Sequence, residues 1–148
     1  MIIITSRTRS PVAGSDEAIN YAMTAEMREK ARQQFTLPDG RGIHLQLPRG
    51  SVLYPGDVLL TEKGEAIIRV IAEPEAVYTI RANHPLALLR AAYHLGNRHV
   101  AMEVTEQYLR IKPDHVLLHL IEQLGSLCIT EEHSPFLPDA GAYVHHHH

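Results

Sequence analysis

Tryptophan is absent from this 148-residue chain, aromatic residues make up 5% of it, and cysteine occurs once. The single thiol, Cys128, cannot form a disulfide within the chain. No apolar run approaches the roughly 18 residues that a membrane-spanning helix needs. The opening "MIII" is too short for a signal-peptide core and has no basic flank. We therefore expect a cytoplasmic protein without a membrane partner, with a core of Leu, Ile, Val and Ala.

Charge and histidine are distributed unevenly along the chain. Residues 1–74 hold nine Lys/Arg and nine Asp/Glu, whereas residues 75–148 hold five Lys/Arg and eight Asp/Glu. Ten of the eleven histidines fall in the second half. An acidic, histidine-rich domain suits a cation better than a phosphate backbone, so nucleic acid is disfavoured as a partner.

The first half has the pattern of short β-strands. "RQQFTLPDGRGIHLQL" places alternating segments on both sides of a Pro-Asp-Gly turn, which indicates a hairpin. Strands are also predicted over 57–60 and 66–71, between Gly- and Pro-containing turns. Residues 14–34 combine good helix formers with no clean apolar stripe, and fit either a strand broken by a turn or a short helix. We predict a small all-β sandwich or barrel-like domain over residues 1–74.

The order of elements changes after the polar link at residues 72–76. A strand (77–82), a helix (84–96), two strands around a turn near Gln107, a second helix (113–125) and a final strand (126–132) give the order β-α-β-β-α-β. Asp114 is the predicted N-cap of the second helix and Gly125 its end. The chain is thus predicted to be α+β, with a ferredoxin-like domain over 75–137 and a flexible tail over 138–148.

Two histidines flank Gly96, the residue that we predict to end the first helix. Being five residues apart, His94 and His99 do not share a helix face as chelating pairs three or four residues apart do. We place His94 in the last helical turn, where the helix dipole favours a cation, and His99 at the entry to the next strand. From these residues alone, a solvated His99 is a simpler interpretation than a metal ligand.

Other side chains could also bind metal. His115 and His119 form an i,i+4 pair that could chelate a divalent ion, although ordinary helix packing is the simpler interpretation. The terminal run of His145, His146, His147 and His148 would bind a borderline transition metal as neutral imidazoles, and is equally typical of a purification tag. We expect Cys128, in an apolar strand pattern, to be buried and inert.

Enzymatic and RNA-binding functions find little support in the sequence. It contains no GxSxG, P-loop, GxGxxG or HExxH motif. The predicted strands of the second domain also lack the aromatic residues on which RNA-binding ferredoxin-like domains stack bases.

Four segments carry a resemblance to a known family. "FTLPDGRGIHLQLPRGSVLYPGDVLL" resembles the first-domain signature of the urease accessory protein UreE family, and "AAYHLGNRHVAMEV" resembles its second-domain signature. "DHVLLHLIEQLG" and "PFLPDAGAY" resemble its last helix and closing segment. Together the resemblance covers roughly residues 25–143.

The resemblance implies a nickel metallochaperone that delivers Ni²⁺ to the urease apoprotein and is not an enzyme. It implies an N-terminal β domain that binds partner polypeptide, and a metal-binding ferredoxin-like domain that forms a homodimer. The implied partners include the urease apoprotein complex and the GTPase UreG. His99 corresponds to the principal ligand and His115 to an accessory one. A second accessory histidine of some members is replaced here by Pro113, and His145–His148 resemble a shortened form of the family's histidine-rich tail.

A two-fold dimer would present His99 twice across its axis, which gives two nitrogen ligands where one chain has one. Tail histidines or waters would complete the coordination shell, and an open shell permits release by ligand exchange. Zn²⁺ or Cu²⁺ would bind the same histidines. The alternative is a metal-independent homodimeric adaptor that binds client polypeptide through its β domain.

Overall fold

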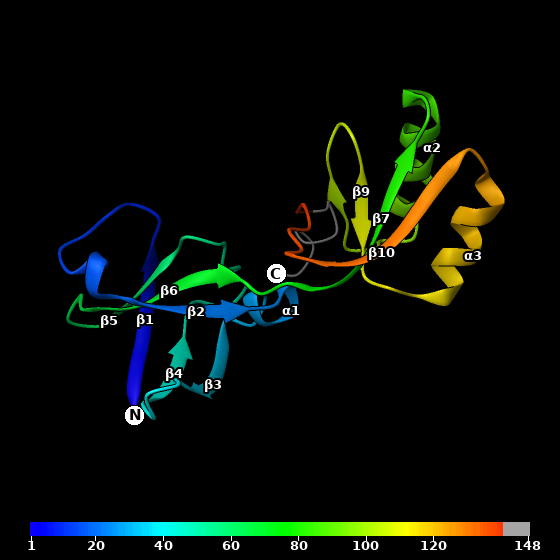
Figure 1. Ribbon diagram of the computed structural model, residues 1–148. Coiled ribbons are helices and arrows are strands. Elements are labelled where there is room, and N and C mark those ends of the chain that lie inside the picture. Colours follow the sequence, from blue (N-terminus) through cyan, green and yellow to red (C-terminus); the bar gives the residue numbers. More distant parts are fainter. Residues whose placement is uncertain (141–148) are drawn as a thin grey trace. The chain divides into compact units, whose positions relative to one another are not determined.

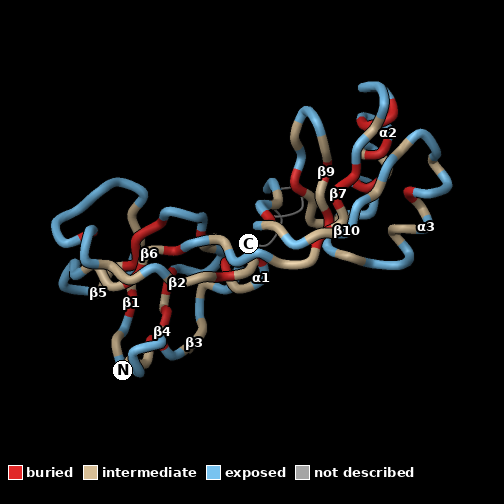
Figure 2. The backbone as a smooth tube through the Cα atoms, viewed as in Figure 1, coloured by how far each residue is buried: buried red, intermediate tan, exposed pale blue. Residues whose placement is uncertain are grey.

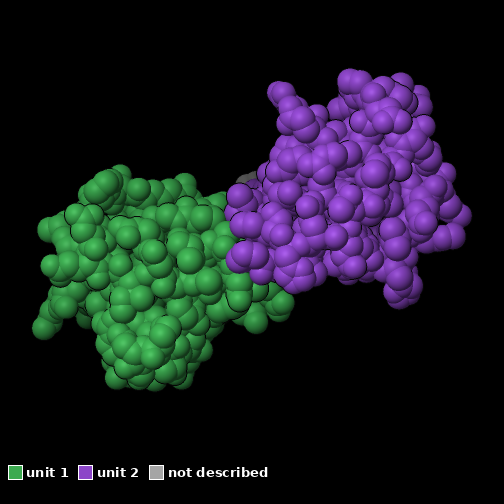
Figure 3. All heavy atoms as spheres, viewed as in Figure 1, with its two compact units in different colours: residues 1–73 green, residues 74–148 purple. Residues whose placement is uncertain are grey.

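In the computed structural model, which describes residues 1–140, the chain forms two compact units, Met1–Glu73 and Pro74–His148 (Figure 3). Each unit has its own apolar core, and each is described separately below. Within the described residues, no helix has both the length and the apolar character needed to cross a membrane.

The first unit is a curled six-stranded sheet (Figure 1). The strands run in the order β2-β6-β5-β1-β4-β3, with parallel pairs β1–β4 and β2–β6 and antiparallel pairs elsewhere. Their bounds are β1 (Ile2–Thr8), β2 (Ile19–Met23), β3 (Arg32–Thr36), β4 (Gly42–Gln46), β5 (Val58–Thr61) and β6 (Ala66–Ala72).

The predicted hairpin is confirmed as β3–β4. The N–H of Leu37 donates to Arg41 O (2.8 Å), and Gly40 occupies the left-handed region (φ 94°) that glycine tolerates without a steric penalty. The Asp39 carboxylate accepts the N–H of Arg41 (3.0 Å). This hydrogen bond from the backbone lowers the pKa of Asp39 below its usual value.

Residues 14–34, which the sequence left open between strand and helix, contain both. A single 3₁₀ turn, η1 (Ser15–Glu17), precedes β2, and a four-residue helix, α1 (Ala25–Arg28), precedes β3. The Thr24 hydroxyl caps α1 by accepting the N–H of Met27 (3.2 Å). A helix this short has no room for the repeated apolar stripe that identifies longer helices.

Apolar side chains of the curled sheet form the first core. Fully buried Ile4, Ile43, Leu45, Leu59 and Ile68 come from four strands, and their positions follow the alternation of a half-buried sheet. Figure 2 shows buried positions recurring along the strands of this unit.

The second unit has the predicted β-α-β-β-α-β order, and its fold is ferredoxin-like. The sheet is antiparallel, in the order β10-β7-β9-β8. Core side chains of α2 and α3 pack with Ile80, Leu109 and Ile111, so both helices cover one face of the sheet (Figure 1). The bounds are β7 (Glu75–Ala82), α2 (Pro85–Gly96), β8 (Glu103–Val104), β9 (Leu109–Ile111), α3 (His115–Leu124) and β10 (Leu127–Ser134).

The predicted ends of α3 are confirmed. Asp114 is its N-cap, since its carboxylate accepts the N–H groups of Val116 (2.8 Å) and Leu117 (3.1 Å). Gly125 follows the helix with φ 75°. Pro85 occupies the first turn of α2, where its missing N–H costs no helical hydrogen bond.

The prediction that Cys128 is buried was wrong, because its side chain is exposed. Leu127 and Ile129 pack into the core under the helices. In β10 the side chains alternate between the two faces, so Cys128 lies on the face away from the helices, with Arg81 as its cross-strand neighbour.

Candidate metal centre

A tight turn follows α2 and presents His99. Consecutive N–H groups of Asn97, Arg98 and His99 donate to carbonyls three or four residues earlier, with the last bond running from His99 N to Gly96 O (3.1 Å). His99 itself is in the left-handed region (φ 56°), which reverses the chain direction. The imidazole is exposed at this reversal.

Two details differ from the prediction. Helix α2 ends at Gly96 as expected, but the residue with positive φ is His99, and the helix is capped by Asn97 in a right-handed conformation. His99 also lies within the turn and not at a strand entry, because β8 begins at Glu103. The three short-range hydrogen bonds continue the helical path past Gly96 and move the reversal to His99.

His94 occupies the last turn of α2 as predicted and is half-buried. Its ring packs edge-on against Tyr93, with centroids 5.4 Å apart. This contact is with the adjacent residue on the helix, and a structural role for His94 stays a prediction.

The other predicted histidines of this unit lie on α3. His115 is the first residue of the helix and is exposed. The neighbouring Asp114 carboxylate is engaged in capping, which limits it as an oxygen ligand. His119 is exposed and its Nε2 lies 3.1 Å from the Gln123 side-chain nitrogen.

Within residues 1–140, no group of three His, Cys, Asp or Glu side chains converges to form a metal site. His145, His146, His147 and His148 lie outside the described residues. His99 and His115 therefore belong to no three-ligand cluster within the part of one chain that is described. Each offers a nitrogen donor of the type that Ni²⁺, Zn²⁺ and Cu²⁺ accept when the imidazole is neutral.

An apolar stripe lies on the outer face of α2, and the sequence reasoning did not single it out. Leu86, Leu89 and Tyr93 are 50%, 66% and 66% exposed. Their i, i+3, i+7 spacing places them on one helix face, opposite the face formed by Leu88, Ala91 and Leu95 that packs on the sheet. The spacing of these three residues could be seen in the sequence. Because α2 has apolar residues on opposite faces, however, the sequence does not show which face packs on the sheet.

Comparison with known proteins covers nearly the whole chain. The family model described as "UreE urease accessory protein, N-terminal domain" matches residues 8–72, and that described as "UreE urease accessory protein, C-terminal domain" matches residues 75–148. The chain belongs to the UreE family of urease accessory proteins. The UreE resemblance seen in the sequence is thereby confirmed, and the two-unit α+β architecture agrees with the two UreE domains.

Several UreE proteins are similar over most of their length. The urease accessory protein UreE of Nostoc punctiforme is 49% identical over 143 residues, covering 97% of this chain and 96% of that protein. The UreE protein of Nostoc sp. is 50% identical over 125 residues, 84% of each chain. That of Thermosynechococcus vestitus is 41% identical over 146 residues, 99% of this chain and all of its own.

Proposed function

We propose that this protein is a nickel carrier in urease assembly that holds Ni²⁺ between two copies of the chain through His99. Membership in the UreE family supports the role in urease assembly. The single observation that carries the metal proposal is the exposed His99 imidazole at the chain reversal after α2. Ion delivery requires no catalysis by the carrier, and we propose none.

The stripe of Leu86, Leu89 and Tyr93 supports the homodimer. Exposed apolar patches of this kind mark interaction surfaces, and this one lies on the helix whose end leads into the His99 turn. A second copy that packs on the stripe by two-fold symmetry would bring the same turn of each chain to the axis. Two His99 side chains would then supply two nitrogen ligands to one ion.

His115 and the histidines 145–148 are proposed as accessory ligands. His115 is exposed at the start of α3, where its imidazole is open to solvent. A site that relies on exchangeable accessory ligands can release its ion to the next protein, whereas a closed four-ligand site retains it. The proposed recipients are the urease apoprotein complex and its accessory proteins, including the GTPase UreG.

Calorimetric titration with Ni²⁺ tests the proposal in the full chain. The His99→Ala variant is expected to lose the tightest binding event. The matched control is His133→Ala, which removes an exposed histidine of the same unit on β10 and is expected to bind as the parent does. Unchanged tight binding in His99→Ala would refute the His99 site and assign the ion to other histidines of the chain, whereas absence of tight binding in the parent would favour the metal-independent adaptor.

A further inference from the structure

Arg9 and Asp57 lie side by side where two neighbouring strands of the first unit end. β1 and β5 pair antiparallel with Thr8 opposite Val58, so the residue after β1 and the residue before β5 leave the sheet together (Figure 1). The Asp57 side chain is 1% exposed, and its Oδ1 lies 3.5 Å from Nε of Arg9, whose side chain is 63% exposed. A buried carboxylate thus orients an arginine that reaches into solvent.

Two other groups fix Asp57 independently of Arg9. Its Oδ2 accepts from Arg7 Nη1 (2.7 Å) and from the N–H of Tyr54 (2.9 Å). Arg7 Nη1 also donates to the carbonyl of Val52, which ties this cluster to the loop before β5. Two arginines with one carboxylate leave the cluster with one excess positive charge, which is available to an anion from outside.

The aromatic ring of Tyr54 is the second support for Arg9. The guanidinium carbon of Arg9 lies 4.6 Å from the ring centroid, in a cation–π contact, and Tyr54 is itself 41% exposed. Among residues 1–140, neither Nη group of Arg9 has a hydrogen-bond acceptor. These two groups form a planar fork, whose N–H donors match the two oxygens of a carboxylate.

A pocket of about 350 Å³ adjoins this fork and is lined by Arg9, Tyr54, Pro55, Gly56 and Asp57. The rings of Tyr54 and Pro55 supply apolar surface beside the charged group. A lone carboxylate gains little from one exposed arginine in water, so a small acid would bind weakly here. A polypeptide can add apolar contacts to the same ion pair, and arginine and tyrosine are the residue types that dominate binding at protein interfaces.

The charge of the cluster favours a carboxylate over a phosphate. One excess positive charge balances one carboxylate. The buried carboxylate of Asp57 lies behind Arg9 and would repel the second negative charge of a phosphate.

We propose that this Arg9 pocket binds an acidic side chain of a partner polypeptide. The Arg9 fork would hold the carboxylate, and Tyr54 and Pro55 would pack against the apolar part of the same segment. The inference goes beyond the proposed function, because it concerns the first unit and involves no metal ion. Loss of the nickel site would leave it unchanged.

Titration of the metal-free full chain with two capped pentapeptides tests the pocket. Acetyl-Gly-Leu-Glu-Leu-Gly-amide carries one carboxylate, and its Gln counterpart has the same size without the charge. Two-dimensional NMR at constant ionic strength follows the amide signals of Tyr54 and Gly56. We expect the Glu peptide to bind about tenfold more tightly, because only its carboxylate forms charge-assisted hydrogen bonds with the fork.

Substitutions of arginine separate the fork from charge in general. Arg9→Gln should bind the two peptides equally, and Arg9→Lys, which keeps the charge but not the fork, should keep only about a threefold preference. The matched control is Arg41→Gln, which removes another exposed arginine of the same unit and should keep the tenfold preference. Since Arg9 is exposed, both of its variants should have nearly the urea midpoint of the parent.

Several outcomes would overturn the inference. They are equal binding of the two peptides by the parent, no shift with either peptide, and a preference that survives in Arg9→Gln. An equal loss of preference in Arg41→Gln would show that net charge, and not the pocket, selects the peptide. Sodium acetate is expected to displace the Glu peptide at least as well as sodium phosphate; displacement by phosphate at lower concentration would indicate a site for small oxyanions and refute the acidic-polypeptide assignment.

Discussion

The backbone N–H of His99 donates to the carbonyl oxygen of Gly96 across 3.1 Å, and this bond closes the turn that places His99 at φ 56°. The proposed metal ligand is thus itself the residue that reverses the chain after α2. The side chain of His99 is proposed to bind Ni²⁺, and its positive φ affects stability. Different substitutions at this position can test the two effects.

His99→Gly and His99→Ala should both lose tight Ni²⁺ binding but differ in stability. Glycine adopts positive φ without a steric penalty, whereas alanine is strained there, so we expect the glycine variant to have the larger free energy of unfolding by about 1 kcal/mol. Urea denaturation of the metal-free proteins measures the difference. An alanine variant at least as stable as the glycine variant would contradict the left-handed assignment.

Leu89→Glu should disrupt the proposed dimer. It places a charge at the centre of the exposed stripe on α2, and burying that charge against a second copy is unfavourable. Sedimentation equilibrium is expected to show a dimer for the parent and a monomer for the variant. Val116→Glu is the matched control, because Val116 is 53% exposed on α3 and outside the stripe; dissociation by this control as well would argue against the stripe as the interface.

Asp114→Ala should destabilise α3 without weakening Ni²⁺ binding. Both N–H groups that the carboxylate accepts lose their partner, which costs about 1 kcal/mol of unfolding free energy. Asp114→Asn keeps a capping oxygen and is expected to retain most of the stability. Thermal unfolding measures the loss, and a parallel loss of Ni²⁺ affinity in both variants would show that Asp114 is a ligand and not only a cap.

Asp57→Ala should strongly destabilise the first unit. The Asp57 side chain is 1% exposed, and its Oδ2 lies 2.7 Å from Arg7 Nη1 and accepts the N–H of Tyr54 (2.9 Å). Removing it leaves a partly buried arginine and a backbone donor without this acceptor, which costs about 2–4 kcal/mol. The control is Asp39→Ala, which breaks an exposed pair with Arg41 and should leave the urea midpoint nearly unchanged. Similar midpoints for the two variants would contradict the structural role of Asp57.

Local signals in the sequence were enough to predict much of the second unit. Asp114 and Gly125 marked the ends of α3 because capping and left-handed glycine depend on neighbouring residues alone. The His99 turn was not predicted, because the local signal for a chain reversal is Gly96. The structure places the reversal three residues later, at His99. The exposure of Cys128 could have been predicted from the alternation at the start of β10, had Leu127 and Ile129 been assigned to the core face.

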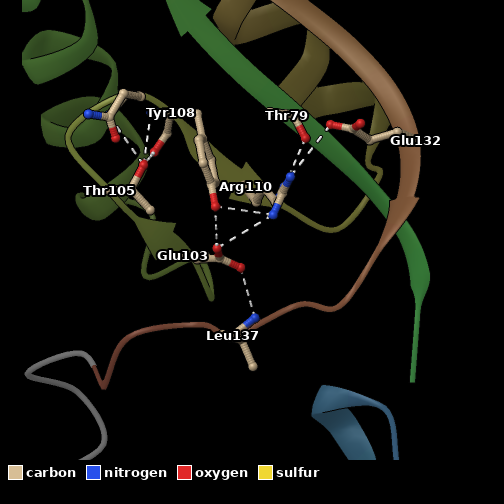
Figure 4. A network of polar contacts seen from close by, with 8 residues as sticks. Thr79, Glu103, Thr105, Tyr108, Arg110, Glu132 and Leu137 are labelled. Carbon is tan, nitrogen blue, oxygen red and sulfur yellow. Dashed lines mark hydrogen bonds and ion pairs between the residues drawn. The ribbon is translucent and has the colours of Figure 1, made fainter. Parts of the chain in front are cut away.

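Contacts between residues far apart in the chain have no local signal in the sequence. The parallel pairing of β1 with β4 joins segments about 40 residues apart, and no pattern within either strand specifies its neighbour. The hydrogen bond between Glu103 and Leu137 likewise joins residues far apart in the chain (Figure 4). In the sequence, Glu103 is recognisable only as an acidic residue in a predicted strand. Such contacts depend on the sheet order, which follows from packing of the whole unit.

The most direct test of the shared metal site is the stoichiometry of Ni²⁺ binding to the chain ended at Val144. We predict about one tightly bound ion for every two chains, measured by isothermal titration calorimetry on the dimer, because each chain supplies one His99. One tight ion for every single chain, or no tight ion at all, would contradict a site formed by His99 from two copies.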